Sequence, residues 1–451
     1  MVQHKEYLGH YLEEFDTFEK DFSKVEPDWF QDIRKTGIKQ FEEQGFPTAR
    51  RGNEPWKYTN TSPIAKTLFL PRSINLKDPF GFDSLVQEEL SGIQADTFVF
   101  VDGRYRAEFS KIGKLDQGPM VLTLQDAIKR CPEILREHIG KYADNKENGF
   151  ISLNSAFFTD GMLIFIPDNY ETQRPLNIIF ISSDFCPNLV NNLRVLVVTG
   201  ENSKLSYMES YISLSRNLTL NNTVTEIFAG KNSEILHHRA LRENAEGFHI
   251  GMTRVWQDAS SFFQSTSIGG GSALTRNDYH VVLGQPDSTC ILNGLHITDR
   301  REHVDNHITV SHLEPRTTSR QNFKSILSGE SRSVFSGKIC VQRNAEQSDA
   351  QQSDKNLILS KGAEVDSNPS LEILTDDVKC THGATSGEIS EEGLFYIMSR
   401  GFDKPTAQNI LIRAFGEEII DNISDSFVKT YFSNTIFEGL LPKGVEGIRG
   451  E

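Results

Sequence analysis

Short apolar runs separated by turn-forming residues occupy the middle of the chain and constrain its fold more than any other feature. From about residue 200 to 388, runs rich in Val, Ile, Phe and Thr alternate with Gly, Asn, Ser and Asp, as in SVFSGKICV, NLILS, LEIL and DDVKC. No helix long enough for a βαβ crossover separates them, so we expect the strands to stack on one another. The pattern predicts an all-β stack or solenoid, although the amino-acid sequence shows no clear repeat.

The first part of the chain predicts helices instead. Pro27 is a good first-turn residue and Gly45 an easy helix end, so a helix is expected between them, burying Trp29, Ile33 and Phe41. The loop-like segment 45–60, GFPTARRGNEPWKYTN, follows it. A first helix is predicted by apolar residues that recur every three or four positions: Leu8, Tyr11, Leu12, Phe15, Phe18 and Phe22.

A mixed region begins near residue 95 and leads into the strands. Strand-like runs occupy 97–101, 163–166, 176–181 and 193–198, around a helical piece near 124–142. We therefore divide the chain into a mainly helical N-terminal domain at 1–150, a β-helix core at 151–388 and a helical C-terminal domain at 389–451.

The C-terminal domain carries clear helix signals. Ser390 followed by two glutamates is typical of an N-cap with an acidic first turn, and Gly401 ends that helix. A second helix starts near Pro405 and is expected to stop before Gly416, followed by a further acidic, apolar stretch to about Phe437. Its apolar face is predicted to contain Ala407, Ile410, Leu411 and Phe415.

Charge and composition exclude several functions. The 451 residues include 47 basic and 62 acidic side chains, a net charge of −15, which disfavours nucleic acid and anionic membrane surfaces. No apolar run approaches the roughly 20 residues of a membrane span, and the N-terminus lacks a secretory pattern, so we expect a cytoplasmic protein. The five cysteines are scattered, with no CxxC pair, and are expected to be reduced.

Common enzyme motifs are incomplete. No Gly-Lys pair is followed by Ser or Thr, so no P-loop is present, and neither HExxH nor GxSxG occurs. The glycines at 269–271 lack the third glycine of a dinucleotide fingerprint, because Leu274 stands there. We therefore expect no catalytic residues of these classes.

Two clusters contain possible metal ligands. In REHVDNHITVSH, His303, Asp305 and His307 share one face of a strand, but His312 falls on the other, so a structural role is favoured. In DDVKCTHGATSGEIS, Cys380 and His382 share a face and offer the sulfur and nitrogen ligands that iron prefers. Two ligands do not complete a metal site. A Cys-x-His pair is more often structural than metal-binding, because free cysteine is among the most buried residue types.

The stretch from His303 to Phe415 resembles the core of the SufB/SufD family of iron-sulfur cluster assembly proteins. The resemblance is carried by VDNHITVSH, SVFSGKICV, QSDKNLILS, AEVDSNPSLEI, DDVKCTHGAT and EEGLFYIMSRGF, in that order. The segment GFPTARRGNEPWKYTN is similar to the N-terminal signature of the SufD branch. SufB proteins usually carry acidic residues on both sides of the corresponding histidine, whereas Thr381 and Gly383 occupy those places here.

The resemblance implies a right-handed parallel β-helix between helical domains and the role of a non-catalytic scaffold. It implies pairing with a SufB-like subunit, where His382 and Cys380 would take part in building a transient iron-sulfur cluster shared with that partner. It also implies binding of the SufC ATPase by the C-terminal helices; a homodimer is possible for the isolated chain, and the residues do not decide whether a flavin takes part. The helix residues assigned to SufC binding are Leu394, Phe395, Tyr396, Arg400, Gly401 and Phe415.

Two other classes stay open. A β-helical carbohydrate-active enzyme would use paired carboxylates, but Asp376 and Asp377 are adjacent and would point to opposite faces of a strand. A homodimeric interaction protein without a metal role is the other alternative.

Overall fold

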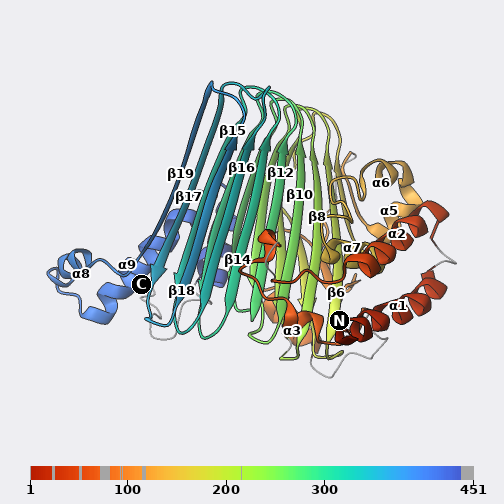
Figure 1. Ribbon diagram of the computed structural model, residues 1–451, viewed down its shortest axis with the longest axis horizontal. Helices are drawn as coiled ribbons and strands as arrows, with labels where there is room; N and C mark the ends of the chain where they lie inside the picture. The colour runs from red at the N-terminus through yellow and green to blue at the C-terminus, as the bar shows by residue number, and fades with distance from the viewer. Residues whose placement is uncertain are drawn as a thin grey trace.

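The computed structural model is mainly β, with 42% of its residues in strands that form a β-solenoid of about eight turns. It describes residues 2–22, 26–49, 53–71, 82–91, 93, 95–113, 118–214 and 216–437. Helices flank the solenoid at both ends of the chain, as the sequence predicts (Figure 1). No helix in these described ranges is long and apolar enough to cross a membrane.

Two sheets form the solenoid. Their strands pair in parallel, except for one short antiparallel strand at the first edge of each sheet, and from the fourth strand onward the chain alternates between the sheets. One sheet has the spatial order β19 (Val378–Gly387), β17 (Ser348–Ile358), β15 (Thr318–Leu327), β13 (Thr289–Thr298), β11 (Phe262–Gly270), β9 (Glu234–Arg242), β7 (Lys204–Ser213), β5 (Leu176–Ser182), β1 (Asp96–Val101) and β2 (Arg104–Tyr105). The other has the order β18 (Glu364–Ile373), β16 (Arg332–Val341), β14 (His303–His312), β12 (Leu274–Leu283), β10 (Phe248–Gln257), β8 (Thr219–Ala229), β6 (Leu189–Thr199), β4 (Gly161–Ile166) and β3 (Met120–Thr123).

The apolar faces of the two sheets meet inside the solenoid. Phe100, Phe180 and Tyr211 stack along this interior, with ring centroids 5.2 and 5.1 Å apart. The strands predicted at 97–101, 163–166, 176–181 and 193–198 are β1, β4, β5 and β6. Because β1 and β3 already pair into the two sheets, strands of the solenoid begin before residue 151.

A structural repeat exists although the sequence shows none. The turn that joins each even-numbered strand to the next odd-numbered one contains a residue with positive φ, from β4 to β17. Asn169, Asn202 and Asn232 also form a side-chain ladder, in which each Nδ2 donates to the Oδ1 of the preceding asparagine at 3.0 Å. Later positions use other residue types for the same backbone conformation: Ser260, Asp287, Arg316 and Gln347.

Helices cover the outer face of the first coils. They are α1 (Val2–Phe22), α2 (Asp28–Gln44), α3 (Ser62–Ala65), α4 (Phe82–Glu89), α5 (Leu124–Arg130), α6 (Pro132–His138) and α7 (Gly149–Phe157). Helix α2 begins after Pro27 and ends at Gly45, as predicted, but its buried face differs. Phe30 and Arg34 are buried together with Phe41, whereas Trp29 and Ile33 are only half-buried.

Arg34 is buried because its charge is fully paired. Its guanidinium lies 2.6 Å from the Glu26 carboxylate and donates to the Phe158 carbonyl at 2.7 Å. Gly37, one turn further on, lets α2 approach α7 closely, since a Cβ there would lie 2.7 Å from the Ala156 nitrogen.

The 45–60 loop is anchored on the solenoid rather than free. Its short 3₁₀ turn, Glu54–Trp56, places the Trp56 ring 3.8 Å from the Arg276 guanidinium of β12. The same guanidinium donates to the Pro55 carbonyl at 2.8 Å, and the Thr59 hydroxyl donates to Asp305 of β14. The described part of the loop is therefore ordered, as expected.

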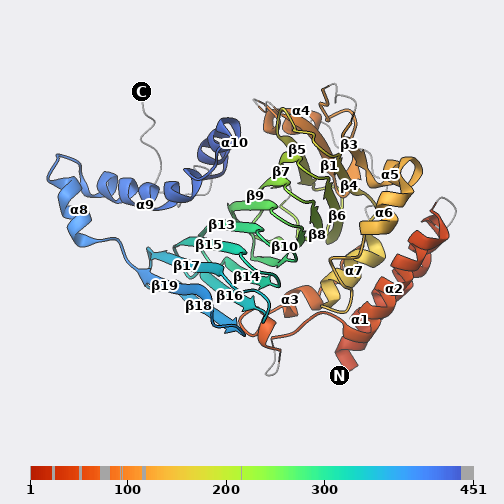
Figure 2. The same cartoon turned by 90° about the horizontal axis from the view of Figure 1, so that it is seen from above.

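Most of the C-terminal segment packs on the outer face of the odd-numbered strands, whereas its first helix contacts the second helix and projects away from the solenoid (Figure 2). They are α8 (Glu391–Met398), α9 (Lys404–Ile420), α10 (Ser426–Tyr431) and a π-helical turn, Phe432–Phe437. The predicted stop before Gly416 is wrong: α9 continues through it, because the missing side chain makes room for the Phe437 ring. Its buried face uses Ile412, Ile419 and Ile420; of the four predicted residues only Ala407 is fully buried.

Candidate functional site

The last coil of the solenoid ends in two strands that are each paired on one side only. Among the described strands, β19 pairs with β17 and β18 pairs with β16, so their outer edges carry unpaired backbone groups. No residue of either strand is fully buried. Figure 1 shows β19 at this end, which we call the open end.

Register places Cys380 and His382 on the inward-facing side of β19. In the parallel pair, Ala350 lies beside Cys380 and Gln352 beside His382. Ala350 and Gln352 are buried inside the solenoid, and register partners point to the same side of a sheet. The structure therefore places Cys380 and His382 on the same side of β19, where the interior of the solenoid meets its open end.

The two side chains differ in their surroundings. Cys380 is half-buried and packs with Leu371 and Val378 on the last apolar cluster of the interior, whereas His382 is exposed. Burial raises the pKa of the Cys380 thiol; a hydrogen bond from the Ala350 backbone lowers it, and the Asp349 carboxylate raises it further. The thiol is thus held protonated at neutral pH until a metal or a new neighbour favours the thiolate.

Neither histidine-containing cluster forms a complete metal site in one chain. Among the described residues, no group of three or more His, Cys, Asp or Glu side chains could hold a metal ion. Asp305 pairs with Arg276, which also lies 2.9 Å from Asp278. His312 lies on the opposite face of β14 from His303 and His307, as predicted. This face points inward, and the His312 ring lies within 2.8 Å of the Thr317 hydroxyl.

Three inward-pointing polar side chains lie on β17, one coil away from His382, and the sequence analysis did not identify them. Gln352, Asp354 and Asn356 alternate along β17 and all point inward, so the run QSDKN contained the signal as a period of two. Asp354 accepts hydrogen bonds from Asn356 Nδ2 at 2.7 Å and from the Ser367 hydroxyl. Burial raises its pKa, and those two hydrogen bonds lower it again only in part.

Helix α8 presents an apolar face to solvent. The Ser390 hydroxyl caps it by accepting a hydrogen bond from the Gly393 N–H at 3.1 Å. Phe395 is 75% exposed and Tyr396 60% exposed. Arg400 lies over the Tyr396 ring at 5.0 Å and donates to its hydroxyl at 3.1 Å.

The other helix residues predicted for partner binding lie outside the exposed aromatic face of α8. Gly401 ends the exposed turn after α8 with a φ of +100°, and Leu394 is half-buried. Phe415 lies on α9, where Lys324 of β15 donates to its carbonyl at 2.8 Å and approaches its ring at 4.5 Å. Phe415 thus attaches α9 to the solenoid, apart from the exposed face of α8.

A direct chain connection links the two features. Strand β19 ends at Gly387 and α8 begins at Glu391, so three residues separate the strand with His382 from the exposed helix. Helix α9 then returns to the solenoid, where the buried Lys324 also pairs with Glu418.

Sequence comparisons agree with this architecture. Residues 1–178 match the SufBD protein N-terminal region, and residues 181–415 match the SufBD core domain of the SUF system for FeS cluster assembly.

Individual relatives extend over most of the chain. A SufBD-family iron-sulfur cluster assembly protein of Synechocystis is 30% identical, over 82% of this chain and 83% of its own length. SufD of Escherichia coli is 28% identical, over 87% and 89%. SufB of Bacillus subtilis is 24% identical, over 87% and 86%.

Proposed function

Because the chain belongs to the SufB/SufD family of iron-sulfur cluster assembly proteins, we propose that it is a SufD-type, non-catalytic scaffold subunit. In this role it pairs with a SufB-like subunit at the open end and binds a SufC-like ATPase through α8. The observation that carries the proposal is the position of Cys380 and His382, which project together from the unpaired last coil.

The open end has the properties of a docking surface. Its strand edges offer directional backbone hydrogen bonds to another strand, which favours one partner orientation. Apolar side chains at the same end supply contact area, with Ile373 40% and Leu374 48% exposed. A partner seated there would cover the last coil, which a solenoid otherwise leaves in water.

An iron-sulfur cluster would be built at this junction as cargo of the complex. This chain supplies one thiol and one imidazole, and four ligands are typical of a cluster, so the partner or bound sulfide would supply the rest. Covering Cys380 and His382 by the partner also keeps water and oxidants from the forming cluster, because the interior of both coils is then closed.

Helix α8 is the proposed ATPase contact. Its exposed aromatic face matches the anchors that dominate protein interfaces, and Arg400 holds the Tyr396 ring in place before binding. Nucleotide-driven movement of the ATPase would pull α8 while Lys324 keeps α9 on β15. The strain would fall on β19 and loosen the partner contact around His382.

The test is co-expression with SufB-like and SufC-like proteins, followed by anaerobic measurement of iron and sulfide bound to the purified complex. His382→Ala should reduce cluster formation by about tenfold or more without disrupting the complex, because a ligand is lost. Thr381→Ala, which changes the outward-facing neighbour on the same strand, is the matched control. Equal cluster formation in both variants would remove His382 from the mechanism.

A second variant tests the ATPase contact separately. Phe395→Asp should weaken retention of the SufC-like protein about 30-fold or more, as expected for an interface anchor. Leu85→Asp, at a 52% exposed site on α4, should leave retention unchanged. Normal retention by Phe395→Asp would contradict the docking role of α8.

A further inference from the structure

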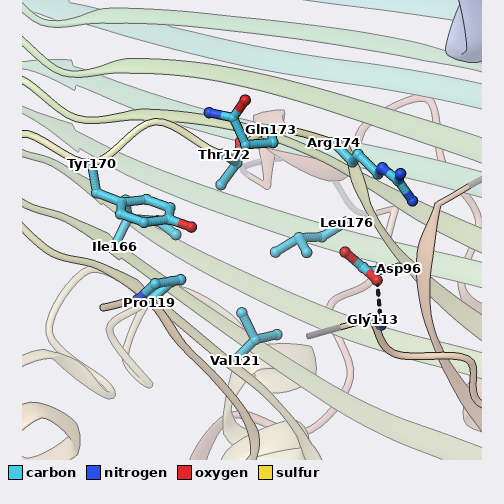
Figure 3. Close-up of a pocket in the computed structure, with 10 residues that line it drawn as sticks. All are labelled: Asp96, Gly113, Pro119, Val121, Ile166, Tyr170, Thr172, Gln173, Arg174 and Leu176. Atoms are coloured by element: carbon cyan, nitrogen blue, oxygen red, sulfur yellow. Dashed lines mark hydrogen bonds between the residues drawn. The ribbon is translucent and has the colours of Figure 1, made fainter. Parts of the chain in front are cut away.

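A cavity at the opposite end of the solenoid takes no part in the function proposed above. It has a volume of about 290 Å³ and lies between the starts of β1 and β5 on one side and β3 and the end of β4 on the other (Figure 3). Small-molecule pockets span roughly 300–1,000 Å³, so this one suits a small metabolite and not a nucleotide. Its lining consists of Asp96, Gly113, Pro119, Val121, Ile166, Tyr170, Thr172, Gln173, Arg174 and Leu176.

The cavity has a charged end and an apolar end. In Figure 3, Arg174 and Asp96 lie on one side, beside Leu176, while Tyr170 and Ile166 lie on the other. Leu176 and Ile166 belong to the apolar interior of the first coil, and Tyr170 packs against it. A bound molecule would therefore meet both charges at one end, and the Tyr170 ring and the Ile166 side chain at the other.

Arg174, Asp96 and Thr172 can each form a further hydrogen bond or ion pair with a ligand. Arg174 is exposed and makes no ion pair within the described part of the chain. Asp96 uses Oδ1 to accept a hydrogen bond from the Gly113 N–H at 2.6 Å, which holds the carboxylate in place and leaves Oδ2 for another donor. Thr172 Oγ1 accepts from the Ser206 N–H at 3.2 Å, so its own proton can be donated.

We propose that this cavity binds a free α-amino acid with an apolar side chain. The carboxylate would pair with Arg174 and the ammonium group with Asp96, since an α-amino acid carries both charged groups on the same carbon atom. The side chain would extend along Leu176 and Ile166 toward the Tyr170 ring. A simple carboxylate or a simple amine would leave one of the two protein charges unpaired, so the zwitterion is the matching class.

Binding is tested on the full-length chain by titration calorimetry with four compounds. L-Leucine and L-phenylalanine should bind saturably. 4-Methylpentanoate, which lacks the amine, and 3-methylbutylamine, which lacks the carboxylate, should bind at least about tenfold more weakly than leucine, since each loses one charged hydrogen-bonding pair. No saturable binding of either amino acid, or equal binding of either analogue, would overturn the proposal.

Variants assign the binding to this cavity. Arg174→Met and Asp96→Asn should each weaken leucine binding by about tenfold or more. Arg343→Met changes an exposed arginine in the turn after β16 and should bind leucine like the unaltered chain. Circular dichroism and the thermal midpoint check that each variant is folded. Leucine affinity unchanged in both folded cavity variants would place the binding elsewhere and contradict the assignment.

Discussion

The early coils and the last coil of the solenoid have opposite relations to solvent. Every residue of β5 and β6 is buried, whereas β18 and β19 contain no fully buried residue. At the first coil, the short antiparallel strands β2 and β3 form the sheet edges, and helices lie beside them (Figure 2). At the last coil, the parallel edges carry no further strand within the described residues.

The difference indicates which end is built for stability and which for contact. A solenoid needs capped ends because an exposed apolar coil and unpaired edges favour association. Within the described residues the cap is present at one end only, and the other end carries Cys380 and His382. Substitutions at the two ends should therefore differ sharply in the stability of the isolated chain.

The largest difference is expected for apolar truncations. Phe100→Ala, inside the first coils, should lower the free energy of unfolding by about 3–5 kcal/mol, because it leaves a cavity beside Phe180. Leu371→Ala, half-buried on β18, should cost about 1 kcal/mol or less, because much of its surface is already in water. Urea unfolding of the two variants measures the difference, and equal costs would contradict it.

A smaller difference is expected for ion pairs. Glu226→Gln leaves the buried Arg194 guanidinium without its anion and should cost about 3 kcal/mol. Asp366→Asn breaks the partly exposed pair with Arg332 on the last two coils and should cost about 1 kcal/mol or less. Thermal unfolding in low and high salt distinguishes the two ion pairs, since salt screens the attraction only in the exposed Asp366–Arg332 pair. Similar losses for both would show that the open end is as well packed as the rest.

The last comparison concerns the pH dependence of stability. Burial alone would raise the pKa of Glu209 inside the middle coils, but Arg239 and His237 lower it to about 2. Its stabilising contribution is therefore present above its ordinary value of 4.5 and is lost as pH falls from 4.5 toward 2. Asp354, near the open end, has a pKa raised above 3.8, so its contribution is largest at low pH and is lost as pH rises through the raised pKa.

The two carboxylates should consequently respond in opposite ways to neutral substitution. Glu209→Gln should lower stability at pH 7 and flatten the acid side of the stability profile. Asp354→Asn should leave stability at pH 7 unchanged or slightly raised. Urea midpoints at pH 3, 5 and 7 measure both, and a clear loss for Asp354→Asn at pH 7 would contradict the assignment.

The sequence predicts the elements well where a local signal exists. Pro27 and Gly45 mark α2, Ser390 caps α8, and the apolar runs give the strands of the first coils, because each depends on residues close in sequence. The repeat is hidden because the corner requires a positive φ and not one residue type: asparagine, serine, aspartate, arginine and glutamine all fill it.

The site was predictable only in part. The spacing of Cys380 and His382 puts them on one face, but only the register with Ala350 and Gln352 shows that this face points inward. The exposed residues of α8 and the anchoring role of Phe415 depend on which helix packs on β15, which no local pattern contains. The cavity is formed by segments near residues 96, 119 and 170, which meet only in the folded solenoid.

Hydrogen exchange of β19 tests the central claim most directly. Amide exchange of residues 378–387 is compared with that of 189–199 in β6, for the chain alone and in complex with SufB-like and SufC-like proteins. We expect β19 to exchange rapidly in the isolated chain and slowly in the complex, while β6 is protected in both. Protection of β19 that does not change on complex formation would contradict the claim that the open end is the partner interface.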